Sequence, residues 1–388
     1  MTVRVNKSSF NIREKLSELA VKFGLKGSEL MRAETAQEAR DLVSAGRKNL
    51  VINGDMRIAQ RGTSFAVAAS GAFAADRWKY EASTNAEVTI SQQTAWNNGP
   101  YWAHSIKVET TTARSSTAST NFGQFLYHIE ANDSGRFRFG TSEAKPFTFS
   151  FWVKSNKTGK FPASFQNNNG SRVFPTDYTI NRADTWEKKI IVVPGDISGS
   201  WNLYGNGTGM RFTLMWAMGS NFINGTKGAW ATATSYSNLT TTAGDQMDVV
   251  GATLEFAQVQ LEVGKNATDF EHRSYGEELA LCQRYYYHHA DASAKPVCNG
   301  AAYQSSRAFG VVHLPVTMRT SPSVIATSGP SNFRFFANGT STGFSTLTLQ
   351  ENFITAVTVE TSNTLSVTAG HAGWIRTDAG ALAFNAEL

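Results

Sequence analysis

The stretch VQLEVGKNATDFEHRSYGEELALCQRYYYHH, residues 259–289, decides how this chain is divided. Its first five residues alternate apolar and polar side chains, which is the period-2 pattern of a half-buried β-strand. Ser274 and Glu277 then form the pattern of a helix capping box. Three side chains share one face of the helix that follows: Leu279, Cys282 and Tyr286. The stretch therefore predicts the last strand of a β domain followed by a connector helix at residues 274–292.

Upstream of this stretch, the sequence has the composition and periodicity of a β-sandwich. Charged residues make up 17% of the chain, below the typical ~25% of globular proteins, and aromatic residues make up 12%. Apolar and polar side chains alternate in residues 102–108, 125–129, 147–154 and 212–218. Seven Asn-Gly pairs supply the positive φ angles that tight hairpins need. Because no fixed repeat appears, residues 49–273 are predicted to form a two-sheet jelly-roll sandwich rather than a solenoid.

The first 48 residues follow a helical period instead. Asn11 and Glu14 resemble a capping box, and a narrow apolar stripe follows. The stripe consists of Ile12, Leu16, Leu19 and Phe23. A second short helix is predicted from Thr35. Two short helices cannot offset the chain entropy of ordering 48 residues, so this segment is expected to dock on sister chains or on another protein through the stripe.

Residues 293–388 are predicted to form a second β-sandwich of short strands. Val312, Leu314, Val316 and Met318 alternate with polar residues or proline, and Pro315 indicates an edge strand or a bulge. Leu382, Phe384, Ala386 and Leu388 also alternate, which predicts a paired and buried strand. The expected fold class is therefore mainly β: a short N-terminal helical segment, a jelly-roll β-sandwich, a short connector helix and a second C-terminal β-sandwich domain.

Several segments resemble proteins of tailed bacteriophages. NLVINGDMRIAQRGTSF at residues 49–65, ADRW at residues 75–78 and the stretch 259–286 are similar to sequences that recur in tail-fibre and other virion proteins. Residues 3–19 resemble the start of structural proteins from short-tailed cyanophages, and residues 309–324 carry a looser match. The resemblance implies a virion-attachment segment, a middle domain like a carbohydrate-binding module, and a β-rich tip.

The resemblance also implies a function and a set of partners. It favours a virion tail fibre or receptor-binding protein, a homotrimer that residues 1–48 attach to a tail adaptor, a nozzle or the capsid, and that binds host surface polysaccharide. Two alternatives stay open, namely a capsid decoration protein and a glycan-depolymerising tailspike. The expected location is the virion, with assembly in the host cytoplasm, because the first 30 residues hold charged side chains and no apolar run of a signal peptide.

Sugar binding requires an exposed aromatic platform with polar neighbours, because a pyranose ring has an apolar face and a rim of hydroxyls. The candidate platforms are Trp152, Trp201, Tyr204 and Trp230. Trp152 lies on the polar side of its strand, and the others lie in segments with loop composition. The alternatives are that both faces of the Trp152 sheet are covered, and that Trp201 and Trp230 pack under a loop or at a subunit contact. Trp216 is assigned to the core by its alternation.

The sequence offers little sign of catalysis, and no enzymatic activity is expected. Glu130, Asp133 and Glu143 are the best nominees for a glycosidase pair, but surface carboxylates are the commoner role for such residues. No nucleophile elbow, HExxH motif or Walker loop occurs. His288 and His289 are adjacent and so are poorly placed to share a metal ion.

No cofactor or metal ion is expected either. Asp55, Asp76 and Glu262 could donate oxygens to a structural calcium ion, but they do not cluster in the sequence. Cys282 and Cys298 are expected to be buried thiols rather than a disulfide.

The net charge of +5 is concentrated at one end of the chain. Residues 1–48 hold ten Lys or Arg against six Asp or Glu, a net of +4. The signs alternate, and no pattern of interleaved aromatic and basic residues supports a nucleic-acid groove, so nucleic-acid binding is not expected. No stretch approaches the ~18 apolar residues of a membrane span, so membrane insertion is not expected.

Overall fold

The computed structural model describes residues 47–67, 71–83, 86–94, 104–114, 118–222, 226–232, 247–291, 294–362 and 364–388. The chain divides into two units, residues 1–49 and residues 50–388. The predicted docking stripe, Ile12, Leu16, Leu19 and Phe23, lies outside the described residues. The described part of residues 50–388 is mainly β, as the sequence predicts.

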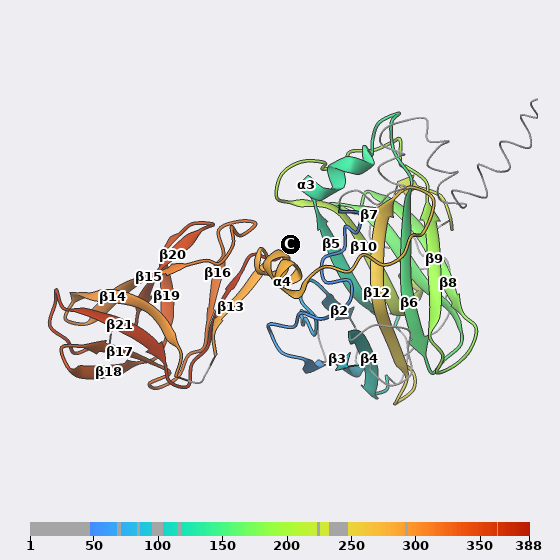
Figure 1. The fold of residues 1–388 in the computed structure, drawn as a ribbon. Coiled ribbons are helices and arrows are strands. Elements are labelled where there is room, and N and C mark those ends of the chain that lie inside the picture. Colours follow the sequence, from blue (N-terminus) through green and yellow to red (C-terminus); the bar gives the residue numbers. More distant parts are fainter. Residues whose placement is uncertain are drawn as a thin grey trace, which may run out of the picture. The chain divides into compact units, whose positions relative to one another are not determined.

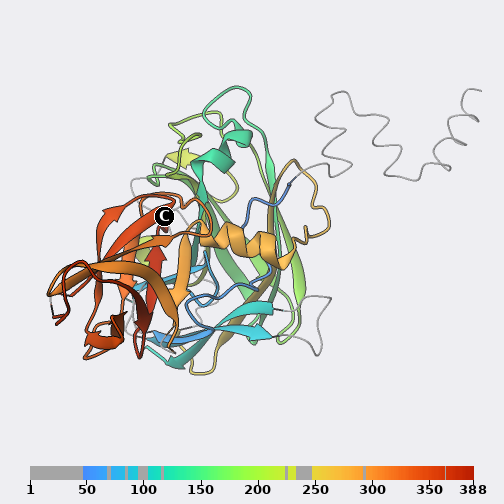
Figure 2. The same cartoon turned by 60° about the vertical axis from the view of Figure 1, so that its left-hand side comes forward.

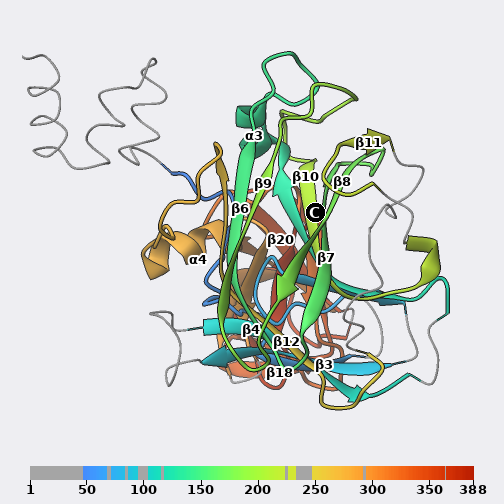
Figure 3. The same ribbon diagram turned by 90° about the vertical axis from the view of Figure 1, so that its right-hand side faces the viewer.

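Two six-stranded antiparallel sheets form the jelly-roll sandwich (Figures 1 and 3). The first sheet has, in order, β1 (Ser64–Val67), β3 (Glu87–Thr94), β4 (His104–Thr112), β12 (Thr253–Val263), β6 (Phe147–Ser155) and β9 (Glu187–Val193). The second has β11 (Ala231–Thr232), β8 (Arg172–Ile180), β7 (Gly159–Asn167), β10 (Thr208–Met218), β5 (Phe122–Glu130) and β2 (Lys79–Ser83). Among the described residues, its connections contain three single-turn helices: α3 (Ala131–Ser134), η1 (Gly135–Phe137) and η2 (Ser220–Phe222).

The core between these sheets is aromatic, because alternate residues of the central strands point inward. Phe149 of β6 lies 4.7 Å from Phe212 of β10, ring centre to ring centre, so the two sheets meet through these rings. Tyr127 stacks on Phe212 at 5.0 Å from within the second sheet. Trp216 is fully buried in the same cluster, which confirms its core assignment. Ring pairs of this kind add stability beyond the buried area alone.

The segment directly after the sandwich consists of a helix and then a strand. The helix α4 (Tyr275–Gln283), seen lengthwise in Figure 2, begins at Ser274, whose hydroxyl accepts from the N–H of Glu277 at 3.3 Å. The predicted cap is therefore present. However, the connector helix does not extend to residue 292, because β13 (Tyr286–Ala290) is a strand that pairs with β22. Three adjacent tyrosines and two histidines favour the extended backbone, and tertiary pairing decides the matter.

The C-terminal domain contains a three-stranded and a seven-stranded antiparallel sheet. The first has β13, β22 (Leu382–Asn385) and β16 (Ser323–Ala326). The second has β18 (Thr340–Phe344), β17 (Phe333–Ala337), β21 (Ala372–Thr377), β14 (Pro296–Gln304), β15 (Arg307–His313), β20 (Ala356–Thr361) and β19 (Leu347–Asn352). A single apolar cluster that includes Phe333, Phe335 and Phe384 packs this domain.

Two details of the C-terminal domain differ from or refine the sequence prediction. The strand before Pro315 is neither an edge nor bulged at the proline, because β15 ends at His313 and lies between β14 and β20. The predicted buried strand at Leu382 is the central strand β22, and both of its partners belong to the same chain.

Candidate functional site

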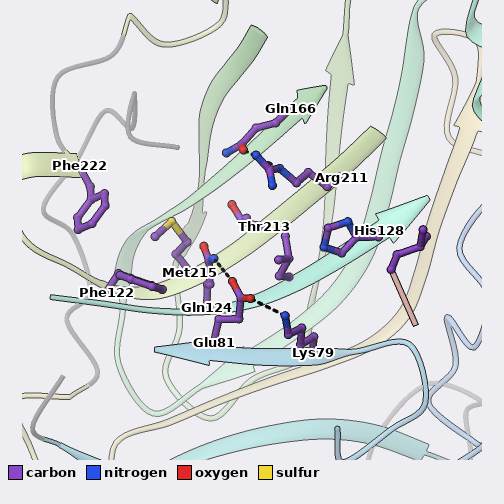
Figure 4. Close-up of a pocket in the computed structure, with 12 residues that line it drawn as sticks. Lys79, Glu81, Phe122, Gln124, His128, Gln166, Arg211, Thr213, Met215 and Phe222 are labelled. Carbon is purple, nitrogen blue, oxygen red and sulfur yellow. Dashed lines mark hydrogen bonds and ion pairs between the residues drawn. The ribbon is translucent and has the colours of Figure 1, made fainter. Parts of the chain in front are cut away.

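A groove of about 390 Å³ lies on the outer face of the second sheet, and we call it the sheet groove. Strands β2, β5, β7 and β10 supply most of its lining, because residues that alternate with the core positions point to this face (Figure 4). The lining residues are Lys79, Glu81, Phe122, Gln124, Leu126, His128, Gln166, Arg211, Thr213, Met215, Phe222 and Leu388. The volume falls within the ~300–1,000 Å³ of typical small-ligand sites.

A chain of hydrogen bonds fixes the polar side chains at one part of the groove. Nε of Arg211 donates to Oε1 of Gln166 at 3.0 Å. The amide of Gln166 donates to the hydroxyl of Ser164 at 2.9 Å, and that hydroxyl lies 2.9 Å from the hydroxyl of Thr213. All four residues are buried or nearly so. Because these side chains are already ordered, ligand binding would cost little further side-chain entropy of the protein.

His128 contributes a neutral imidazole to the groove. Burial, and then the positive charges of Arg77, Arg211, Lys79 and Arg319, lower the pKa of His128 to about 3. At neutral pH the ring therefore has one donor and one acceptor nitrogen. Its Nδ1 lies 3.1 Å from the hydroxyl of Thr208, a residue outside the groove lining.

The remaining lining combines an ion pair with an aromatic pair. Lys79 and Glu81 form a salt bridge at 2.8 Å, and the amide of Gln124 donates to Glu81 at 3.2 Å (Figure 4). Phe122 and Phe222 meet edge to face at 5.5 Å. The sheet groove thus presents amide, hydroxyl, imidazole and ammonium groups beside two half-exposed rings. This combination suits a ligand with many hydroxyls and an apolar face.

The predicted platform Trp152 lies elsewhere, on the outer face of the first sheet. It is half-buried in a hollow of about 300 Å³, lined also by Lys188 of β9 and by the segment after β12, which contributes Asp269, Phe270 and His272. That segment partly covers the outer face of the sheet, and Ser150 beside Trp152 is buried. Trp152 is thus neither fully covered nor an open platform.

The three loop aromatics are two packed tryptophans and one exposed tyrosine. Trp201 and Trp230 meet edge to face at 5.3 Å, and both pack against Phe139 and the core. The indole N–H of Trp201 donates to Asp196 at 3.1 Å, and that of Trp230 donates to the carbonyl of Pro194 at 2.7 Å. Tyr204 is 79% exposed. The structure does not bring these three residues together with Trp152 or with the sheet groove.

Two of the nominated carboxylates, Glu130 and Glu143, each lie beside an arginine. Glu130 is buried, and it accepts from Arg284 at 2.6 and 3.0 Å and from the hydroxyl of Tyr285 at 2.7 Å. Burial opposes ionisation of Glu130, but these hydrogen bonds outweigh it and lower the pKa of Glu130. A general acid needs the opposite shift. Glu143 is exposed and lies 3.6 Å from Arg138.

The residues considered for metal binding each have other partners. Asp55 pairs with Arg57 at 2.7 Å, Asp76 accepts from Gln60, and Glu262 accepts from Thr268. Within the described ranges, no group of three or more His, Cys, Asp or Glu side chains could hold a metal ion. The rings of His288 and His289 contact different backbone carbonyls, those of Gln60 and Val297, at 2.7 Å each. Cys282 and Cys298 are free thiols, and burial raises the pKa of Cys298 to about 12.

The segments that carry the phage resemblance meet in a buried joint. The N–H of Asn53 donates to Glu278 of α4 at 2.5 Å, and the indole N–H of Trp78 donates to the carbonyl of Asn53 at 3.0 Å. Arg77 pairs with Glu387 and donates to the carbonyl of His128 at 2.6 Å. These motif residues are therefore structural, since they join the sandwich to α4 and to the end of the C-terminal domain.

The apolar face predicted for α4 packs within this joint. Cys282 is fully buried with Ile52, Ile58 and Tyr285, and Leu279 packs against them. Tyr286, the third member predicted for that face, lies on strand β13 instead. The α4 face therefore serves an intrachain contact.

The chain matches no protein-family model, and no curated protein sequence matches it significantly. Among solved structures it is similar to the enzymatically active domain of tailspike protein 4 of bacteriophage CBA120, at 12% identity and a TM-score of 0.30. That match covers 56% of this chain and 21% of the tailspike chain, so this chain spans about a fifth of the tailspike's length.

Carbohydrate-binding modules are also similar in structure. A CBM4 module matches at 11% identity and a TM-score of 0.29 over 55% of this chain and all of the module. The family 11 module of a Clostridium thermocellum cellulosomal cellulase matches at 13% identity and a TM-score of 0.28, over 52% of this chain and 97% of the module. Similarities this distant do not determine what the chain binds.

The sheet groove is not among the sites predicted from the sequence, although alternation gives part of its signal. Arg211, Thr213 and Met215 alternate with the core residues of β10, and Gln124, Leu126 and His128 do the same in β5. Alternation marks these residues as outward-facing. It does not show that β5 and β10 are neighbours. Their pairing, for example of Phe212 with Tyr127, joins residues far apart in the sequence.

Described helices of the chain are all too short or too polar to cross a bilayer.

Proposed function

We propose that this chain is a structural protein of a bacteriophage virion, a tail fibre or receptor-binding protein that attaches the particle to host surface glycans through the sheet groove. One observation carries the glycan part of the proposal: a preordered set of polar side chains beside the Phe122–Phe222 pair in a groove of about 390 Å³. The virion part is supported by the sequence resemblance at residues 49–65 and 259–286.

The chemistry of the groove fits sugar hydroxyls. Arg211 and Gln166 are held 3.0 Å apart, and Gln124 and Glu81 are held 3.2 Å apart, so amide and charged groups have fixed directions. The rings of Phe122 and Phe222 offer an apolar surface for the C–H face of a pyranose. Sugar sites of this type are weak singly, and a homotrimer with several fibres on each particle would raise the avidity.

Binding without cleavage is the form of the proposal that the groove supports. Glycoside hydrolysis normally needs two carboxyl groups about 5 to 10 Å apart, one with a raised pKa. Among the described residues that line the groove, Glu81 is the only acidic side chain, and it is paired with Lys79 at 2.8 Å. A depolymerase would have to place its chemistry elsewhere.

The glycan proposal is tested with the full-length protein by native gel electrophoresis in gels that contain xylan, mixed-linkage β-glucan, galactan, dextran or bacterial lipopolysaccharide. We expect retardation in at least one gel, and about two- to tenfold weaker binding for Gln124→Ala and for Phe222→Ala, since each loses one hydrogen bond or one ring contact. Lys160→Ala is the matched control, because Lys160 is exposed on β7 outside the groove. Equal retardation of all variants would exclude the sheet groove as the glycan-binding site. New reducing ends on the polysaccharide would exclude a non-enzymatic role.

The virion proposal is tested separately. Deletion of residues 1–48 is expected to give particles that lack this chain, because we propose that this segment carries attachment. Electron microscopy of the particles distinguishes missing tail fibres from missing capsid knobs, which separates the receptor-binding role from the capsid decoration role. Particles that still carry the shortened chain would remove the proposed role of the segment.

A further inference from the structure

The seven-stranded sheet of the C-terminal domain has a second groove, of about 480 Å³, which we call the tip groove. It lies at the β17–β18 hairpin and the start of β21. Its apolar lining is Phe336, Ala337, Ala372 and Trp374, and its polar lining is Asn338, Thr340 and Ser341. None of these residues is among the candidate sites predicted from the sequence.

The two rings of the tip groove stand on the outer face of the sheet rather than in the core. Phe336 and Trp374 are cross-strand partners, and their rings stack at 4.5 Å with an angle of 12° between the planes. The neighbouring residue Phe335 is fully buried, so alternation turns Phe336 outward. Trp374 remains 36% exposed, although a tryptophan is among the most favourable side chains to bury.

Charged neighbours hold this ring pair in place. The guanidinium of Arg376 lies 4.7 Å from the centre of the Phe336 ring, as in a cation–π contact. Arg376 is fixed in turn by Asp378, to which it donates at 2.7 and 3.0 Å, and Arg334 donates to the same carboxylate at 2.7 Å. The orientation of the rings is therefore set before any ligand binds.

Backbone geometry shapes the groove around the rings. Asn338 and Gly339 have φ angles of 48° and 74°, which form the tight two-residue turn between β17 and β18 and leave the Asn338 side chain exposed. At Gly373 a Cβ atom would lie 2.2 Å from the carbonyl oxygen of Phe336, so only glycine fits there. The groove is thus bounded by an exposed amide, two exposed hydroxyls and a glycine that allows close strand approach.

We propose that the tip groove is a second sugar-binding site, which takes a hexopyranose unit of a polysaccharide. The stacked rings supply the apolar surface for one face of the sugar, and Asn338, Thr340 and Ser341 supply hydrogen-bonding groups for its hydroxyls. The lining favours a sugar over a protein partner, because its apolar part consists only of two rings and two alanines within a polar rim. The site is separate from the sheet groove, so one chain has two points of attachment and gains avidity from both.

The test uses the full-length protein in the same five polysaccharide gels. Trp374→Ala is expected to weaken retardation at least tenfold in one or more gels, and Trp374→Phe is expected to keep most of it because a ring remains. Tyr303→Ala is the matched control, since Tyr303 is a 67% exposed aromatic residue of the same sheet that packs on Phe309 outside the tip groove. Urea unfolding of each variant verifies that the fold is retained.

The same variants in a Gln124→Ala/Phe222→Ala background separate this proposal from the proposed function. Residual retardation that disappears with Trp374→Ala supports two sites. Retardation that depends on the sheet groove and is unchanged by Trp374→Ala overturns the tip site and leaves the proposed function intact. Retardation that depends only on Trp374 supports the tip site and overturns the sheet groove. Absence of retardation of the native protein in all five gels overturns both. If Trp374→Ala does not fold, Thr340→Ala takes its place with the same outcomes, because Thr340 is an exposed lining residue without a positive φ angle.

Discussion

The sheet groove and the tip groove lie on the outer faces of two sheets and are built differently. In the sandwich the rings of Tyr127 and Phe212 point inward, and the outer face presents polar groups such as Gln166 and Arg211. In the C-terminal domain the stacked rings of Phe336 and Trp374 stand on the outer face. Strand alternation is present in both domains, but it shows only that the two faces differ.

The covering of a face, rather than the type of side chain, decides where a ring is buried. The inner face of each sandwich sheet is covered by the other six-stranded sheet. The three-stranded sheet β13–β22–β16 is smaller than the seven-stranded sheet, and the apolar cluster between them holds the inward-facing Phe333 and Phe335. The rings of Phe336 and Trp374 lie on the opposite face of the seven-stranded sheet, where they can contact a ligand.

The largest effect is expected for Glu130→Ala, which asks whether the two domains behave as separate regions. The change leaves the charge of Arg284 and the hydroxyl of Tyr285 without their shared acceptor. Loss of one partner of a largely buried pair destabilises by about 3 kcal/mol. Urea unfolding followed by tryptophan fluorescence and by circular dichroism should show two transitions in place of one. A single transition with an unchanged midpoint would mean that the pair does not couple the domains.

The second prediction contrasts a packed loop tryptophan, Trp201, with an exposed loop tyrosine, Tyr204. Trp201→Ala is expected to lower the free energy of unfolding by about 2 kcal/mol, because Trp201 packs on Phe139 and donates to Asp196. Tyr204→Ala, at a residue 79% exposed, is the control and should change it by less than about 0.5 kcal/mol. If Trp201→Ala weakened polysaccharide binding without loss of stability, Trp201 would instead be a sugar-binding platform.

Gly339→Ala tests whether the hairpin of the tip groove depends on its backbone angle. The φ angle of 74° strains any residue with a Cβ atom, so a loss of about 1–2 kcal/mol is expected from thermal or urea unfolding. The same change at Gly276, in α4 with no positive φ angle, should stabilise the protein by about 0.5 kcal/mol. Losses of equal size at both positions would contradict the role of the turn.

The smallest effect concerns pH, and it should separate the two grooves because only the sheet groove is lined by a histidine among the described residues. The pKa of His128 is near 6.5 when unfolded and about 3 when folded, so the unfolded chain binds more protons between these values. Stability from this group is therefore complete above about pH 6.5 and falls as the pH falls.

In the native protein this contribution is less than about 1 kcal/mol between pH 7.5 and pH 6. His128→Gln should reduce the loss of stability over that range, as measured by urea midpoints, and Trp374→Phe should leave it as in the native protein. An identical pH dependence in His128→Gln would show that the imidazole does not titrate as proposed.

Much of the architecture follows from local patterns. Phe149, Phe212 and Leu261 lie on strands that alternation alone identifies, and Ser274 begins α4 where its capping pattern predicts. The Asn338–Gly339 turn follows from the φ angles that these two residues tolerate. The candidate sites are less predictable. Alternation predicts the outward direction of Trp152, but the segment that half-covers it comes from beyond β12, more than a hundred residues away.

Local patterns establish the class of each segment, because side-chain spacing and turn chemistry act over a few residues. Tertiary structure alone decided which strands are neighbours and which faces are covered. Gln166, Arg211 and His128 belong to one groove only because β7, β10 and β5 are adjacent. Tyr286 lies on strand β13 rather than in the predicted helix, because β13 pairs with β22. Both outcomes depend on contacts between residues far apart in the chain, whose free energies local patterns do not contain.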